Sequence, residues 1–329
     1  MANIVYGIGI SHAPGALGWP EAAAPDVLKR VEEATATLGQ RLRDSRPDVI
    51  VAILDDHFEN QYRNLLPTVS IGVADHHIGP AKQWLEALRL TDQETFPGAP
   101  VIAESLLRSM IKRGFDLARL GSIEYGNNLL VPWKNMEVSS DIPVIPVFIN
   151  VFSAPLMPYM RALALGQALR EAVLELDDGL RVAFIATGGL SHWPPFWTLS
   201  SSEEDRFLQQ RMKRFQTEGK TYLATDPGLY TDLAEYEIRM AKLSQEHGVP
   251  LVNAEWDRSF LKALETSDMS YLEALTFEEV EAHGGHGGHE ILNWLALFGA
   301  MDCAPGRLLA YEDVTEWICG MAYMDFEIS

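Results

Sequence analysis

The sequence predicts an α/β fold with a central mixed sheet flanked by helices and a helical insertion near residues 200–250. Short apolar runs of strand length alternate with stretches of helical periodicity over the first two hundred residues, which is the pattern of a sheet covered by helices. Residues 200–250 are instead charged, periodic and free of strand-like runs. No repeat, low-complexity linker or domain boundary is evident, so we expect residues 1–329 to form a single domain.

The first elements are a strand, a helix and a second strand. Ile4–Ile10 and Val49–Leu54 are apolar, rich in β-branched residues and followed by turn residues or charges, as strands are. Between them, Ala24–Ser45 carries apolar residues at helical spacing after a proline-flanked loop.

The middle of the chain continues the alternation. We expect strands at Val69–Val73 and Arg181–Thr187, and helices at Pro100–Arg113 and Met157–Leu176. Ile142–Asn150 has the composition of a buried strand, but its prolines favour an edge or irregular position because proline cannot donate to a neighbouring strand.

The last third of the chain is predicted to be mainly helical. Ser200–Gln216 and Leu233–His247 read as a helical hairpin inserted after His192. Residues 255–300 read as further helices around a loop rich in glycine and histidine, His283–His289, which leads into the helix Ile291–Ala300.

The composition narrows the classes of function. Forty-six acidic against 26 basic residues give a formal net charge of −20, which repels nucleic-acid phosphates and argues against both nucleic-acid binding and adsorption to a membrane. No apolar stretch is long enough to span a bilayer, and a signal-peptide pattern is missing. Two cysteines, Cys303 and Cys319, are expected to be packing residues and fit a reducing, cytoplasmic location.

Two histidines follow the first two predicted strands closely. His12 lies in Ser-His-Ala-Pro-Gly and His57 in Asp-Asp-His-Phe, and loops leaving the carboxyl ends of strands converge on the ligand crevice of an open sheet. Two imidazoles placed in this way suggest a metal site, although each histidine alone is as well explained by a structural role. Asp55 and Asp56 either orient the His57 ring or cap a turn.

A third histidine, His192, lies in Gly-Gly-Leu-Ser-His directly after a predicted strand. The two glycines allow a tight turn, and a histidine presented there can transfer protons near neutral pH. The segment is not a serine-nucleophile elbow, because no Gly-x-Ser-x-Gly motif is present. The alternative is a turn histidine packed beside Trp193 and Pro194.

The segment His283–Glu290 offers further ligands. Its three histidines at a spacing of three make a metal-binding tract by composition, but glycine-rich sequence does not place them on one helix face. Glu290, at the start of the next helix, could instead complete a two-histidine, one-carboxylate triad, an assignment only slightly better than His286 or His289. A plain glutamate at a helix start is the alternative. We expect His76, His77 and His247 to be surface residues.

Six segments stand in order along nearly the whole chain: S-H-A-P at 11–14, D-D-H-F-E-N at 55–60, P-V-I-P-V-F-I-N at 143–150, G-G-L-S-H at 188–192, N-A-E-W-D-R-S-F-L at 253–261 and H-E-I-L-N-W at 289–294. In these segments the chain resembles the class III (LigB-type) extradiol ring-cleaving dioxygenases. The insertion at 200–250 and E-W-I-C-G-M at 316–321 resemble the single-chain dihydroxyphenylpropionate type of that family.

The resemblance implies a mechanism. His12, His57 and Glu290 would hold Fe(II), which would bind an aromatic vicinal diol (a catechol, protocatechuate or gallate-like compound) together with O₂. His192 would take a hydroxyl proton and return one as the O–O bond breaks, so that the ring opens next to the two oxygens. A homo-oligomer is expected.

The chain departs from the family pattern at one position. Asn127 stands where the family commonly has a second histidine, and an amide can form a hydrogen bond but cannot transfer a proton at neutral pH. Tyr125 is one substitute for that histidine, and Trp193 or Trp197 are candidates to stack on the substrate. The departure leaves open an aminophenol or methoxylated-diol substrate, a zinc-dependent hydrolase on the same fold, and a non-catalytic binding protein.

Overall fold

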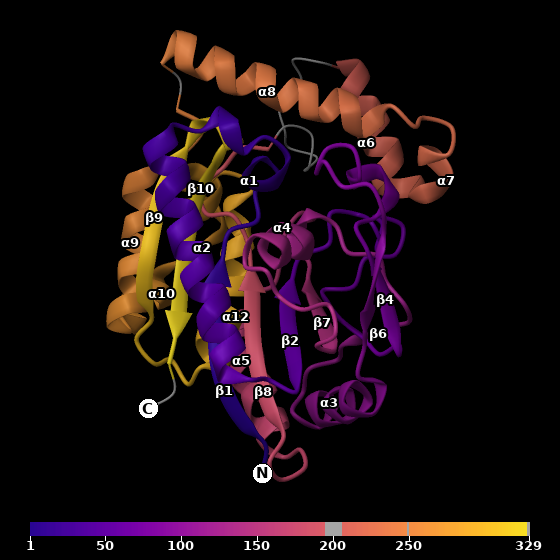
Figure 1. Ribbon diagram of the computed structural model, residues 1–329, viewed down its shortest axis with the longest axis vertical. Helices are drawn as coiled ribbons and strands as arrows, with labels where there is room; N and C mark the ends of the chain where they lie inside the picture. The colour runs from indigo at the N-terminus through magenta and orange to yellow at the C-terminus, as the bar shows by residue number, and fades with distance from the viewer. Residues whose placement is uncertain (195–205, 249, 328–329) are drawn as a thin grey trace.

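An eight-stranded mixed sheet forms the centre of the computed structural model, which describes residues 1–194, 206–248 and 250–327 (Figure 1). The order across the sheet is β6-β3-β7-β2-β8-β1-β10-β9, and β4 and β5 form a separate two-stranded sheet. The strands are β1 (Asn3–Ile10), β2 (Val49–Leu54), β3 (Val69–Gly72), β4 (His76–Gly79), β5 (Glu94–Pro97), β6 (Ala118–Leu120), β7 (Val144–Ile149), β8 (Arg181–Thr187), β9 (Arg307–Val314) and β10 (Cys319–Phe326).

The four central strands, β7, β2, β8 and β1, run parallel to one another. Their carboxyl ends therefore lie at one edge of the sheet. β10 runs antiparallel to β1, so its first residues lie at that same edge. The antiparallel strands on both flanks, β3 next to β7 and β9 next to β10, make the sheet mixed, as predicted.

Helices cover both faces of the sheet (Figure 1). α2 packs against β9, β10 and β1 on one face, while α5 and α12 pack on each other and against β1 and β8 on the other. The helices are α1 (Gly15–Gly18), α2 (Pro25–Ser45), α3 (Pro100–Lys112), α4 (Asn127–Asn135), α5 (Tyr159–Leu174), α6 (Arg206–Glu218), α7 (Lys220–Leu223), α8 (Leu229–His247), α9 (Ala254–Thr266), α10 (Met269–Ala274), α11 (Phe277–His283) and α12 (Ile291–Ala300).

The predicted helical insertion is present as α6, α7 and α8, which lie across the end of the molecule to which the central parallel strands point (Figure 1). Two hydrogen bonds tie it to the loop after β2: Arg63 donates from its backbone N to the carbonyl of Gln216 and from its Nε to Oε1 of the same residue, both over 2.7 Å. The first part of the predicted helix Ser200–Gln216 lies outside the described residues. The insertion thus covers the edge of the sheet at which the loops after the parallel strands meet.

The predicted strands and helices of the first two hundred residues are found within a few residues of the expected bounds. One expectation was wrong: β7 is not at an edge but lies between β3 and β2, fully buried. Its pairing with β3 covers Val147 to Ile149 and does not include Pro146, so the missing N–H of the proline lies outside that ladder. The strands β4, β5, β6, β9 and β10 were not expected from the sequence.

Of the three histidines expected at the surface, two are exposed and one is buried. His76 and His247 are exposed, as expected, but His77 is completely buried in β4, which corrects the surface assignment. We expected a polar turn around His77, but the segment is the strand β4, in which His77 points inward. There its ring packs edge-on against Tyr125. Among the described residues, no helix is long and apolar enough to cross a membrane.

Candidate metal centre

The three histidines that follow predicted strands are brought together at the carboxyl edge of the sheet. His12 lies two residues beyond β1, His57 three residues beyond β2 and His192 five residues beyond β8, and all three are buried. Because these strands are parallel neighbours, their ends meet at one point, where loops of an open α/β sheet form the ligand site.

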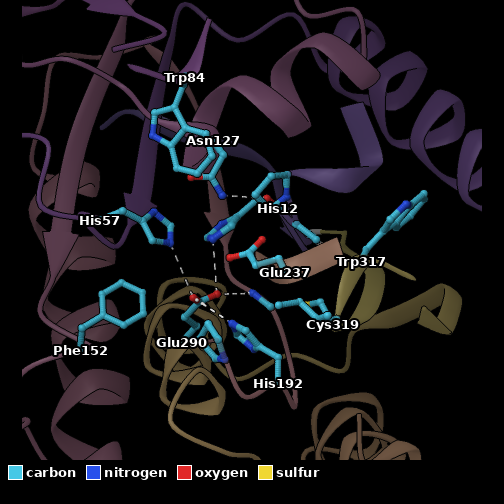
Figure 2. A pocket seen from close by; sticks show the side chains of 15 residues that line it. His12, His57, Trp84, Asn127, Phe152, His192, Glu237, Glu290, Trp317 and Cys319 are labelled. Carbon is cyan, nitrogen blue, oxygen red and sulfur yellow. Dashed lines mark hydrogen bonds and ion pairs between the residues drawn. The ribbon is translucent and has the colours of Figure 1, made fainter. Parts of the chain in front are cut away.

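Glu290 lies at the centre of these histidines (Figure 2). One Glu290 oxygen, Oε2, is 3.4 Å from His12 Nε2, and the other, Oε1, is 4.0 Å from His57 Nε2 and 3.4 Å from His192 Nε2. Asp55 also faces the cluster, with Oδ2 3.4 Å from His57 Nε2 and 3.9 Å from His12 Nε2. One ligand atom each of His12, Asp55, His57 and Glu290 lies within 4.8 Å of every other, so this buried group could hold a metal ion.

The orientation of His12 is fixed by Thr187, the last residue of β8. The Thr187 hydroxyl donates to the backbone carbonyl of Asn128 over 2.7 Å, so it can only accept from His12 Nδ1, 3.0 Å away. The proton of a neutral His12 ring is therefore on Nδ1, which leaves the lone pair of Nε2 directed at the two carboxylates. Such an arrangement prepares an imidazole to bind a metal.

His57 is presented by a tight turn. The Asp56 carboxylate accepts from the backbone N of Asn60 at 3.1 Å and of Gln61 at 2.8 Å, and Phe58 takes up a left-handed backbone with φ of 66°. That conformation is unfavourable for a bulky residue and is held here by the surrounding hydrogen bonds. Of the two aspartates, Asp56 thus caps the turn, and Asp55 alone faces the histidines.

The electrostatics of the cluster favour neutral His12 and His57 rings beside an anionic Glu290. Burial lowers the pKa of His12 and, together with the neighbouring His12, lowers the pKa of His57 to about 3. Burial and the charge of Glu290 raise the pKa of Asp55. For Glu290 burial acts in the same direction, but the three histidines outweigh it and hold its pKa below its ordinary value.

Asp55 is the less satisfied of the two carboxylates. Its Oδ1 accepts from Asn293 Nδ2 over 2.8 Å, but Oδ2 has no hydrogen-bond partner within the part of the chain that the structure describes. Two buried carboxylates between neutral imidazoles form a site that a divalent cation would neutralise, since a buried anion is costly without a counter-charge.

His192 is held by its own loop. Its Nδ1 donates to the carbonyl of Leu190 over 2.8 Å, so Nε2 points to Glu290. Burial opposes the charged form of His192, yet the charge and hydrogen bond of Glu290 prevail and raise its pKa. Gly189 allows the close approach: its N–H donates to Glu290, and a Cβ there would lie 2.6 Å from Cys319 Sγ and 2.8 Å from the His192 ring. The glycine is therefore required by space, not by a left-handed turn.

Asn127, the first residue of α4, lines the same cavity. Its Nδ2 donates to the backbone carbonyl of His12 over 3.1 Å, while its Oδ1 has no hydrogen-bond partner among the described residues. Tyr125 is completely buried beside His77 and Phe96 and does not line the cavity. It therefore cannot substitute for the missing histidine.

The cavity above the cluster holds about 460 Å³ of space not filled by protein atoms, part of it open to solvent. Its aromatic walls are Trp84, Phe152 and Trp317, and the Phe152 ring centroid is 5.0 Å from that of His57. Trp193 does not line the cavity, because it packs over the chain at Gly285, and Trp197 lies outside the described residues. Cys319 is a buried wall residue, and burial raises the pKa of its thiol.

The glycine- and histidine-rich segment does not form a metal site of its own. His289 is buried between the Tyr159 hydroxyl, 2.7 Å from its Nδ1, and Glu281, 3.0 Å from its Nε2. His286 also contacts Glu281, and His283 is exposed. Neither His286 nor His289 joins the cluster, and the structure places Glu290 beside His12 instead.

Sequence reasoning missed part of the cavity. Glu237 of α8 lines it, although it follows His192 by 45 residues in a segment that showed only helical periodicity. Trp84 and Phe152 come from segments without a recognisable pattern. Trp317 lies in the segment 316–321 that resembles the single-chain type, and Asp55 directly follows β2 and precedes His57 by two residues, so both had a visible signal.

Comparison with known proteins agrees with this geometry. The family model of the catalytic LigB subunit of aromatic ring-opening dioxygenase matches residues 6–322. Three relatives bear the name 2,3-dihydroxyphenylpropionate/2,3-dihydroxicinnamic acid 1,2-dioxygenase: those of Cupriavidus pinatubonensis (29% identical, covering 92% of this chain and 93% of the relative), Escherichia coli O81 (28%, covering 94% and 95%) and a Rhodococcus species (27%, covering 90% and 90%).

A solved structure, that of an uncharacterized protein from Escherichia coli K12, covers 98% of this chain at 14% identity with a TM-score of 0.48, a likeness too weak to bear on function. The family match, by contrast, spans nearly the whole chain and includes every residue of the buried cluster. The chain therefore belongs to the LigB family and is an extradiol ring-cleaving dioxygenase.

Proposed function

We propose that the protein uses Fe(II) to insert O₂ into an aromatic vicinal diol and opens the ring next to the two oxygens. The observation that carries the proposal is the buried convergence of His12, His57 and Glu290 at the floor of a cavity with aromatic walls. Two neutral imidazoles and a carboxylate are the donor set of non-haem Fe(II) oxygenases, and the unpartnered Asp55 Oδ2 beside them is explained if a cation is bound. Bound there, Fe(II) would supply the electronic coupling that lets the diol react with O₂.

The chain's own residues then divide the remaining work. His192 Nε2 is directed into the site and, held by Leu190 from behind, is placed to take a hydroxyl proton from the diol and return one to an oxygen after O–O cleavage. Asn127 Oδ1 is an available acceptor, so we assign it to hold a substrate hydroxyl. The aromatic walls fit the faces of a ring and exclude water.

The test combines metal analysis with oxygen uptake. Protein purified without air is expected to contain about one iron per chain, because there is one triad. With Fe(II) and a panel of catechols, gallates and aminophenols, it should consume O₂ and form a yellow ring-opened product from at least one diol. Zinc in place of iron, with no oxygen uptake on any compound, would contradict the proposal.

His192→Ala separates proton transfer from metal binding. We expect it to retain iron while kcat falls about 10²–10⁴-fold, the usual contribution of a general acid–base group. His286→Ala is the matched control, since that histidine is half-buried in the neighbouring loop but does not line the cavity. Loss of iron from His192→Ala would make His192 a ligand.

We further propose that residues 1–329 form one catalytic domain, that the protein is located in the cytoplasm, and that it is a homo-oligomer. A single cluster of buried residues drawn from β1 to β10 supports the first point, and the free thiols of Cys303 and Cys319 support a reducing location. The exposed Phe207 and Ile238 on the insertion helices support contact with a second copy. Light scattering after size-exclusion chromatography should give a mass above 36.6 kDa.

A further inference from the structure

Trp84 forms part of the cavity wall, and other residues hold its indole ring in place. It ends a short 3₁₀ helix, Lys82–Trp84, is buried and lines the cavity near His57 (Figure 2). The centroid of its ring is 6.4 Å from that of His57, and Tyr230 of α8 packs edge-on against it at 5.0 Å. The helical insertion therefore meets the cavity wall at Trp84.

A buried carboxyl group holds the polar edge of this ring. Glu59, two residues after His57, is 1% exposed, and its Oε1 accepts from Trp84 Nε1 over 2.7 Å. Its Oε2 accepts no hydrogen bond from the residues that the structure describes. A carboxyl oxygen can accept from the indole N–H whether the group is ionised or protonated, so the contact does not depend on the charge of Glu59. Since burying a carboxyl group is costly unless it is hydrogen-bonded, the bond to Trp84 gives Glu59 a reason to be there.

Gly126 leaves the space that this pair of side chains occupies. A Cβ on Gly126 would lie 2.6 Å from Glu59 Oε1 and 3.1 Å from Trp84 Nε1. A side chain at position 126 would therefore displace the carboxyl group or the indole, both of which are buried. Gly126 directly precedes Asn127, which lines the cavity. The chain at the start of α4 is thus fitted closely around the hydrogen bond between Glu59 and Trp84.

We propose that Glu59 is a positioning residue for the substrate: it holds the Trp84 indole in the orientation in which the aromatic ring of the diol packs against it. Two aromatic rings attract each other most strongly in offset or edge-on arrangements, so the orientation of the wall ring matters. A ring that is already fixed also loses no side-chain freedom when the substrate binds. The inference rests on the proposed binding of an aromatic diol in this cavity, and Glu59 acts on that diol only through Trp84.

A double-mutant cycle tests whether Glu59 acts through the indole N–H. Iron-loaded protein is titrated with 4-nitrocatechol in the absence of O₂, and the change in absorbance gives Kd. Glu59→Met, of similar length but without an acceptor, should raise Kd about five- to tenfold, the contribution of a well-oriented aromatic pair. Glu59→Gln keeps an acceptor and should stay within about twofold of wild type. In Trp84→Phe, which has no N–H, adding Glu59→Met should change Kd by less than about twofold.

Iron content and an exposed neighbour of Trp84 provide the controls. Every variant should hold about one iron per chain, because no ligand is changed, and Glu86→Leu, at an exposed position, should leave Kd unchanged. Glu59→Leu repeats the cycle with a side chain of another shape, should Glu59→Met not fold. An unchanged Kd in Glu59→Met, an equal effect of Glu59→Met in the wild-type and Trp84→Phe backgrounds, or a loss of iron would overturn the inference and leave the ring cleavage intact. A wild type that neither binds 4-nitrocatechol nor consumes O₂ with any compound of the panel above would instead contradict the proposed function.

Discussion

Removing the Thr187 hydroxyl should weaken Fe(II) binding and lower the stability of the fold, although none of the proposed metal ligands is changed. Thr187 is fully buried, and its hydroxyl both accepts from His12 Nδ1 and donates to the Asn128 carbonyl. Thr187→Val keeps the shape but leaves both groups buried and unpaired. At about 1–3 kcal/mol for each of the two orphaned groups, the free energy of unfolding should fall by about 2–6 kcal/mol. Loss of the partner that sets the His12 tautomer should also weaken Fe(II) binding by about 10–100-fold.

The assay is anaerobic titration of the metal-free protein with Fe(II), accompanied by urea unfolding. Thr187→Ser is the control, because it keeps the hydroxyl and removes only a methyl group, at a cost of about 1 kcal/mol. It should bind Fe(II) nearly as well as wild type. The reasoning is refuted if Thr187→Val binds Fe(II) with wild-type affinity, or if the serine variant loses as much affinity as the valine variant.

Two further changes test the loop that holds His192. A Cβ on Gly287 would lie 2.2 Å from His192 Nε2, so Gly287→Ala should lower kcat by at least tenfold while iron content stays near wild type; Gly228→Ala, where a Cβ meets open space, should have no effect on either. Asp257 accepts from the backbone N and hydroxyl of Ser191, and burial raises its pKa to about 6. Since this folded-state pKa lies above the ordinary value of 3.8, its contribution to stability is full below about pH 4 and is lost as pH rises through 6. Asp257→Asn should therefore shrink the loss of unfolding free energy between pH 4 and pH 7 by up to about 3 kcal/mol, and an unchanged pH profile in urea unfolding would contradict this assignment.

Local pattern was enough to predict most of the sheet. The runs that became β2 and β8 have the predicted bounds, because a short β-branched apolar segment between turn residues has few other ways to bury its side chains. The position of β7 was mispredicted because proline is excluded only where its N–H is needed, and the need depends on which neighbour pairs at that residue. β9 and β10 were missed because neither alternates regularly between buried and exposed residues: β9 is mostly partly buried, and β10 is buried along its whole length.

The sequence by itself determined that histidines follow three strand ends, that a glutamate begins the last helix and that the family is LigB. These are properties of short segments, which local chemistry and motif order reveal. Only the tertiary structure decided that Glu290 rather than His286 or His289 meets His12, and that α8 brings Glu237 into the cavity. Such contacts join residues tens to hundreds of positions apart. They are set by strand order and by the packing of helices across the sheet edge, which no local pattern encodes.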